Sequence, residues 1–161
     1  RRRTLYTYFR HKEEIYYAAI EEGLPLLSEK MVGVTEMHAE PEEKIFALIY
    51  THLSIIRETV LRNGSLRAEF FRDIWMVEKF RRTFDAKEHR ILQLVLQEGI
   101  DKGRFRIENV GLMTDIIHYS VKGLEVPYIY DRLGDGLTED ETYPIVRGIL
   151  VRVLNMPPAL D

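Results

Sequence analysis

The spacing of apolar side chains along the chain is helical almost throughout. Apolar residues recur at i, i+3, i+4 and i+7, whereas the strict alternation of a half-buried strand is scarce. Glycine and proline fall between the helical stretches rather than at the spacing of hairpin turns. The pattern therefore predicts an all-α fold.

Local signals place the predicted helices. Pro41, followed by two glutamates, marks a helix start, and Thr138 with Glu141 forms a capping-box pattern. We expect Gly23 and Pro25 to bend or break the second helix. Together with the periodicity, these signals predict helices over about residues 3–9, 12–31, 41–62, 66–74, 77–102, 109–131 and 138–156.

Charge is distributed unevenly along the chain. The whole sequence carries a formal net charge of -3, yet residues 1–20 hold five basic side chains against two glutamates. A basic tip on an acidic chain is typical of a nucleic-acid reader joined to a second domain. The alternative is a basic chain end that contacts nothing.

Several function classes find no support in the sequence. There is no cysteine, so disulfides, thiolate catalysis and cysteine-based zinc sites are excluded. No two of the five histidines have the i, i+4 spacing of a zinc helix, and no nucleophile elbow, phosphate loop or carboxylate pair stands out. No apolar run approaches the roughly 18–20 residues that span a bilayer. We therefore expect a cytoplasmic protein that is not an enzyme and holds no metal or cofactor.

One short stretch carries candidate chemistry. In TLYTYFRHKEEI (residues 4–15), Leu5 and Phe9 lie four apart and share a face that can pack onto a small core. Hydroxyls, aromatic rings and basic groups lie on the remaining faces. These groups contact phosphate oxygens and base edges when a recognition helix enters a major groove.

The stretch RRTLYTYFRHKEEIYYAAI resembles the end of the helix-turn-helix domain of the TetR family of bacterial transcriptional regulators. A second, weaker resemblance lies in LQEGIDKGRF (residues 96–105), which is similar to the family's long-helix ending, E-G-x-x-x-G-x-aromatic. The family has two helices before the recognition helix that the given chain lacks. We therefore expect most of the DNA-binding domain to lie outside it, either left out or deleted.

The resemblance implies a division of the chain and a set of DNA contacts. Residues 1–20 would be the remainder of the helix-turn-helix domain, with the recognition helix at about 3–9, and residues 21–161 a helical ligand-binding and dimerisation domain. For each tyrosine the alternative is a half-buried packing role. The positions that would contact double-stranded operator DNA are Arg2, Arg3, Thr4, Tyr6, Tyr8 and Lys12.

The second domain would bind a small-molecule effector. Aromatic residues concentrate between positions 46 and 84, and an apolar cavity with a few polar groups is what a small-molecule site needs. The alternative is that these side chains simply fill the core. The candidate effector contacts are His52, Phe71, Trp75, His89 and Tyr119.

The last two predicted helices carry apolar seams that would form a homodimer interface. Gly123 and Gly148 would let helices approach closely, and a two-fold axis would place two recognition helices on a palindromic operator. The alternative is that the seams pack within one chain. The candidate interface residues are Ile117, Val121, Leu124, Ile149, Leu150 and Val153.

The sequence thus favours a ligand-responsive, DNA-binding transcriptional regulator, a repressor released from its operator when a small molecule binds. Effector and operator would be coupled only through their different affinities for two helix arrangements. The alternative is a helical small-molecule-binding or adaptor module without DNA binding.

Overall fold

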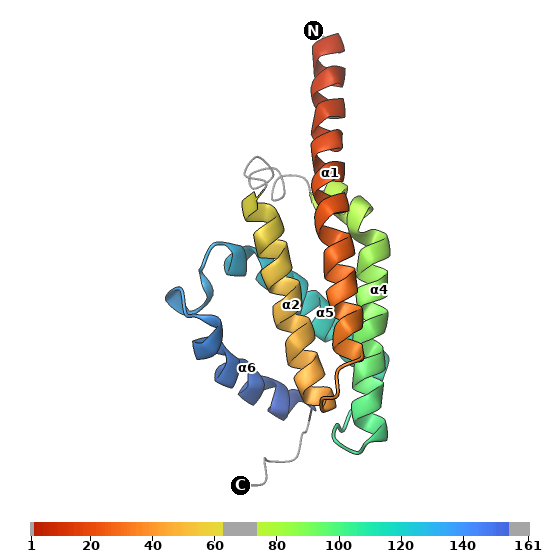
Figure 1. Ribbon diagram of the computed structural model, residues 1–161, viewed down its shortest axis with the longest axis vertical. Coiled ribbons are helices and arrows are strands. Elements are labelled where there is room, and N and C mark those ends of the chain that lie inside the picture. Colours follow the sequence, from red (N-terminus) through yellow and green to blue (C-terminus); the bar gives the residue numbers. More distant parts are fainter. Residues whose placement is uncertain (1, 63–73, 155–161) are drawn as a thin grey trace.

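The computed structural model describes residues 2–62 and 74–154 (Figure 1). Five α-helices and one short 3-10 helix make up the secondary structure of these two ranges, and neither range contains a strand. The all-α expectation is therefore confirmed. No helix within the same ranges combines the length and the apolar character needed to cross a membrane. The expected helix over 66–74 lies largely outside the described residues.

The first element differs from the expectation. The sequence pattern predicted a short helix at 3–9 and a second from residue 12, but α1 (Arg2–Thr35) is one continuous helix. The residues at the expected break, 10–12, are Arg-His-Lys, and none of them is a glycine or proline that would end a helix. Pro25 lies inside α1 without ending it.

Gly23 serves packing rather than helix termination. An added Cβ at Gly23 would lie 2.6 Å from Oγ1 of Thr59 on α2 (Pro41–Arg62). The missing side chain therefore allows α1 and α2 to approach closely at this point.

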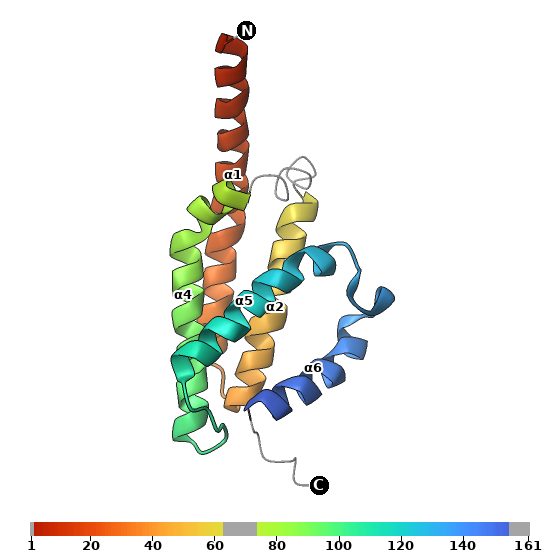
Figure 2. The same ribbon diagram turned by 180° about the vertical axis from the view of Figure 1, so that it is seen from behind.

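Four helices form the core of the molecule. The C-terminal half of α1 packs with α2, α4 (Ile74–Asp101) and α5 (Val110–Ile129), whereas its N-terminal half projects beyond them (Figures 1 and 2). The reverse view shows α5 crossing α2 and α4 obliquely (Figure 2). The most deeply buried large side chains of this core include Leu27, Met31, Ile45, Phe46, Val95 and Leu96.

The turn after α4 explains the glycine spacing in LQEGIDKGRF. Gly103 adopts a left-handed backbone with φ +70°, and the N–H of Arg104 donates to the carbonyl of Gly99 at 2.8 Å. The buried ring of Phe105 lies against Gly99, where an added Cβ would overlap it. The first glycine therefore makes room for the aromatic ring, and the second supplies the turn.

The last helix, α6 (Glu139–Leu154), follows the 3-10 turn η1 (Leu133–Asp135). The expected capping box is confirmed, because Glu141 Oε2 accepts from the Thr138 N–H at 2.7 Å and from its hydroxyl at 2.8 Å. Near its start, the Tyr143 hydroxyl donates to Glu43 on α2 at 2.8 Å. At its end Leu154 is fully buried. The helix is thus attached to the bundle near both ends.

Candidate functional site

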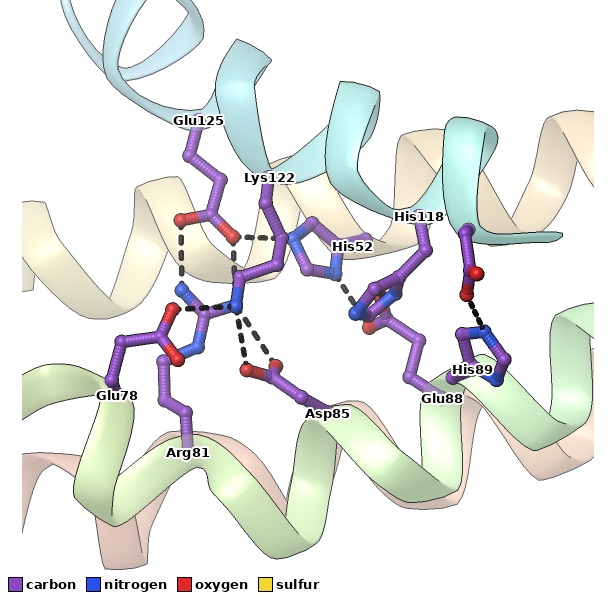
Figure 3. Close-up of polar contacts among 10 residues, drawn as sticks. His52, Glu78, Arg81, Asp85, Glu88, His89, His118, Lys122 and Glu125 are labelled. Carbon is purple, nitrogen blue, oxygen red and sulfur yellow. Dashed lines mark hydrogen bonds and ion pairs between the residues drawn. The ribbon is translucent and has the colours of Figure 1, made fainter. Parts of the chain in front are cut away.

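A cluster of charged and imidazole side chains lies inside the bundle, where α2, α4 and α5 meet (Figure 3). The α4 members are spaced three or four residues apart, which puts them on one face of the helix. The α5 members share the facing side in the same way. We call the following residues the ion cluster: His52 of α2, Glu78, Arg81, Asp85 and Glu88 of α4, and His118, Lys122 and Glu125 of α5.

Arg81 and Glu125 form a bidentate ion pair at the centre of the ion cluster. Nη1 of Arg81 donates to Glu125 Oε2 at 2.8 Å, and Nη2 donates to Oε1 at 2.7 Å. Arg81 is 3% exposed and Glu125 4% exposed. A planar guanidinium matches a carboxylate in this geometry, and the pair fixes α4 against α5.

His52 is held between two glutamates. Its Nδ1 lies 2.6 Å from Glu88 Oε2, and its Nε2 lies 2.7 Å from Glu125 Oε1. A neutral imidazole carries only one N–H, so both bonds form only when the ring is protonated. Burial alone would lower the pKa of His52, but its hydrogen bonds to Glu125 and Glu88 raise that pKa to about 9.

The two glutamates are ionised for the complementary reason. Burial alone would raise their pKa values. His118 and His52 hold the pKa of Glu88 at about 2, while Arg81 and His52 hold that of Glu125 at about 2. The interior of the bundle therefore contains an imidazolium clamped between two carboxylates.

Lys122 pairs with two carboxylates at the more exposed end of the ion cluster. Its Nζ donates to Asp85 Oδ2 at 2.8 Å and to the more exposed Glu78 at 3.0 Å. Burial alone would lower the pKa of Lys122, but these hydrogen bonds to Asp85 and Glu78 raise it above its ordinary value. Three buried carboxylates (Asp85, Glu88, Glu125) are thereby matched by three cations (His52, Arg81, Lys122).

His118 has an unused hydrogen-bonding position. Its Nδ1 is buried without a hydrogen-bond partner, although it lies 3.3 Å from Glu88 Oε1. A buried nitrogen that is not hydrogen-bonded is costly and calls for an explanation. Arg81 Nε and Asp85 Oδ1 are also buried without such a partner.

A small cavity of about 20 Å³ adjoins this end of the ion cluster. Its polar lining is His52, Glu88 and His118, and the remainder of the lining is apolar. A cavity of this size holds roughly one water molecule. The apolar lining residues come from all four core helices and are Met31, Leu48, Ile49, Leu92 and Val121.

The structure gathers only part of the effector contacts expected from the sequence. His52 lines the cavity. His89 does not line the cavity; its Nε2 lies 2.6 Å from Asp115, and its ring lies 5.5 Å from that of His118. Tyr119 is 65% exposed on the outer side of α5 and does not line the cavity. Phe71 and the side chain of Trp75 lie outside the described residues.

Sequence reasoning missed the charged partners of His52. Arg81 and Glu88 lie seven residues apart on α4, as do His118 and Glu125 on α5, so each pair shares one helix face. That spacing is the only signal in the sequence, and a solvent-exposed helix face produces the same one. Within the described ranges, no group of three or more histidine, aspartate or glutamate side chains is arranged to hold a metal ion.

The expected dimer residues divide into two groups. Leu124, Ile149 and Val153 are exposed, whereas Ile117, Val121 and Leu150 are buried within the chain. The apolar residues of α5 and α6 thus occupy two sides of each helix, and only the first three residues lie on the side that a second copy could cover. The exposed side, which we call the outer apolar face, comprises Leu112, Ile116, Tyr119 and Leu124 of α5 and Ile145, Ile149 and Val153 of α6.

The expected DNA contacts all lie in the projecting half of α1 (Figure 1). Arg3 and Thr4 are exposed. The side chains of Arg2, Tyr6, Tyr8 and Lys12 lie outside those the structure describes.

Comparison of the chain with protein-family models, with curated proteins and with solved structures found no match.

Proposed function

We propose that this protein is a ligand-responsive, DNA-binding transcriptional regulator, as the resemblance to the TetR family implies. The observation that carries the proposal is the continuity of α1. One helix runs from the basic, aromatic segment at its start to Met31, which lines the cavity. Because α1 continues through Gly23 and Pro25, a displacement at the cavity would be passed along it to the DNA-contacting segment.

The proposed mechanism is a shift between two helix arrangements. A small molecule in the cavity favours one arrangement only by its greater affinity for it. A coupling of about 1–3 kcal/mol would change operator affinity roughly 5–150-fold. In this proposal effector binding weakens the hold on the operator, so the protein acts as a repressor.

The proposed regulator is a homodimer joined through the outer apolar face. On α5, Ile116 is 50% exposed and Tyr119 65% exposed, although the opposite side of the same helix is also buried. An exposed group of large apolar side chains on a folded protein commonly marks a surface that contacts another molecule. A second copy would cover this face and set two DNA-contacting segments on a palindrome, about one helical turn of DNA or a small multiple of it apart.

Fluorescence anisotropy with the full-length protein and DNA from upstream of its own coding sequence tests the proposal. We expect nanomolar-range binding that weakens as salt rises, because phosphate contacts release counterions. Tyr6→Ala should weaken specific binding by about tenfold or more, as expected for the loss of a base contact. Glu29→Ala, on an exposed position of the same helix, is the matched control and should change nothing.

Binding no tighter than that to random DNA would contradict the proposal. It would favour the alternative of a helical small-molecule-binding or adaptor module.

A further inference from the structure

We propose that the molecule recognised at the cavity is uncharged and mainly apolar, with a single hydroxyl or carbonyl group that pairs with His118. This inference rests on the proposed function, in which that molecule is the effector, and it adds its chemical class. Three features of the cavity carry it.

The first feature is the charge balance of the ion cluster. The buried carboxylates Asp85, Glu88 and Glu125 are each within ion-pair distance of His52, Arg81 or Lys122. Among these six groups carboxylates and cations are equal in number. The fourth carboxylate of the ion cluster, Glu78, is exposed and also pairs with Lys122, so no buried charge in this group awaits a partner from outside. A charged molecule would leave one net charge buried in the bundle, and such a charge is strongly disfavoured. The balance therefore selects against both organic acids and organic amines.

The second feature is the composition of the cavity wall. Five of the eight lining residues are apolar, and the three polar ones, His52, Glu88 and His118, belong to the ion cluster. His52 uses both ring nitrogens on glutamates. Nδ1 of His118 has no hydrogen-bond partner although the residue is 4% exposed. Its 3.3 Å approach to Glu88 Oε1 is an ion-pair contact that falls short of a hydrogen bond, so the wall offers one incompletely bonded polar atom next to an apolar surface.

The third feature is the size of the cavity and the identity of its most adaptable side chain. At about 20 Å³ it holds about one water, so a larger molecule must displace part of the wall. Met31 is unbranched and repacks more readily than the leucine, isoleucine and valine around it. Because Met31 belongs to α1, the same displacement acts on the helix that carries the DNA-contacting segment.

Isothermal titration calorimetry on the full-length protein tests the class with three probes of equal chain length: 1-octanol, octanoate and octylammonium. A hydroxyl both donates and accepts, so it can pair with Nδ1 of His118 whether or not that nitrogen carries a hydrogen. We expect octanol to bind at least about tenfold more tightly than either charged probe, because neither charge finds a free partner. Octanol should also weaken operator binding in the anisotropy assay.

Two histidine variants locate the contact. His118→Phe should weaken octanol binding about three- to tenfold, which corresponds to the loss of one hydrogen bond. His118→Gln restores a polar group and should recover most of that affinity. His38→Phe is the matched control, because His38 is exposed between α1 and α2 and does not line the cavity, and it should leave octanol binding unchanged.

Equal or tighter binding of octanoate or octylammonium would overturn the inference. So would an octanol affinity that His118→Phe leaves unchanged, or the absence of binding by all three probes. None of these results touches the proposed function, because specific DNA binding is measured without any probe on the same preparation.

Discussion

The two sides of α5 reverse the usual distribution of polarity. Its inner side places His118 and Glu125 in the interior, 4% exposed each, whereas its outer side leaves Ile116 and Tyr119 at least half exposed. In most helices of globular proteins the apolar stripe faces the core and the charged side faces solvent. Figure 3 shows the inner, charged side meeting α4 and α2.

The difference shows that each side of α5 is suited to a different kind of partner. A buried charge is tolerated when its partners are fixed, as Arg81 and His52 are fixed around Glu125. An apolar side that its own chain leaves exposed is tolerated when the surface of another molecule covers it. The buried charges of the ion cluster are paired within one chain, whereas in our proposal the outer apolar face is covered only by a second copy.

The largest expected effect on stability comes from removing an ion-pair partner on the inner side of α5. Glu125→Gln leaves Arg81 and His52 buried without their shared anion, and the loss of one partner of a buried ion pair costs about 3–5 kcal/mol. We expect the free energy of unfolding to fall by that amount in chemical denaturation monitored by circular dichroism.

A surface ion pair provides the matched control for Glu125→Gln. Arg57 pairs with the well-exposed Asp131 at 2.8 Å, and Arg57→Met should cost less than about 1 kcal/mol because solvent screens such a pair. Similar losses for the two variants would mean that the ion cluster contributes no more than a surface pair.

The next effect concerns the outer side. Ile116→Asp places a carboxylate at the centre of the outer apolar face, where it would be buried unpaired in the proposed dimer. We expect the dimer dissociation constant to rise by about a hundredfold, close to 2.7 kcal/mol, with little change in the stability of the monomer. Sedimentation velocity over a range of protein concentrations measures it. A wild-type protein that stays monomeric, or a variant that dimerises as well as wild type, would remove the proposed role of this face.

The ion cluster also predicts a pH dependence of stability. The pKa of His52 is raised from 6.5 to about 9, so its contribution is complete below pH 6.5 and is lost as the pH rises through 9. The pKa values of Glu88 and Glu125 are lowered from 4.5 to about 2, so their contribution is complete above pH 4.5 and is lost as the pH falls toward 2. Stability should therefore be greatest between about pH 4.5 and 6.5.

Urea denaturation at pH 5.5, 7.5 and 9.5 measures the alkaline side of this profile. A raised histidine pKa contributes at most on the order of 3 kcal/mol at this size of shift, and the same interactions underlie the glutamate shifts, so the contributions are not summed. His52→Gln should flatten the decline between pH 6.5 and 9. An equally steep decline in that variant would assign the dependence to other groups.

The sequence predicted the helices better than it predicted the site. Pro41 and the Thr138–Glu141 box act within one turn of helix, so local signals were sufficient to place α2 and α6. The break expected before Lys12 was wrong, because Arg10 and Lys12 are good helix formers and no glycine or proline stands there to end the helix. A helix end is encoded locally only where a cap, glycine or proline is present.

The ion cluster could not be predicted because its contacts join distant residues. His52 meets Glu88 and Glu125, which lie 36 and 73 positions away, and nothing local distinguishes these glutamates from solvated ones. The same limit explains the dimer residues. Ile117 and Leu124 are equally apolar in the sequence pattern of α5. Only the packed bundle shows that Ile117 is buried and Leu124 is exposed.

The smallest expected effect comes from Gly123, where one substitution should change monomer stability and dimerisation in opposite directions. Gly123 lies on the exposed side, and an added Cβ there meets no atom of the chain within 4 Å. In a helix interior, Gly→Ala stabilises by about 0.5–1 kcal/mol, so Gly123→Ala should raise the stability of the monomer. If a second helix packs closely against this point, the same methyl group weakens the dimer.

Gly33→Ala on α1 has the same open surroundings and should raise stability without affecting dimerisation. Thermal denaturation and sedimentation of both variants measure the two effects, and equal dimerisation by the two would place Gly123 outside any close helix contact.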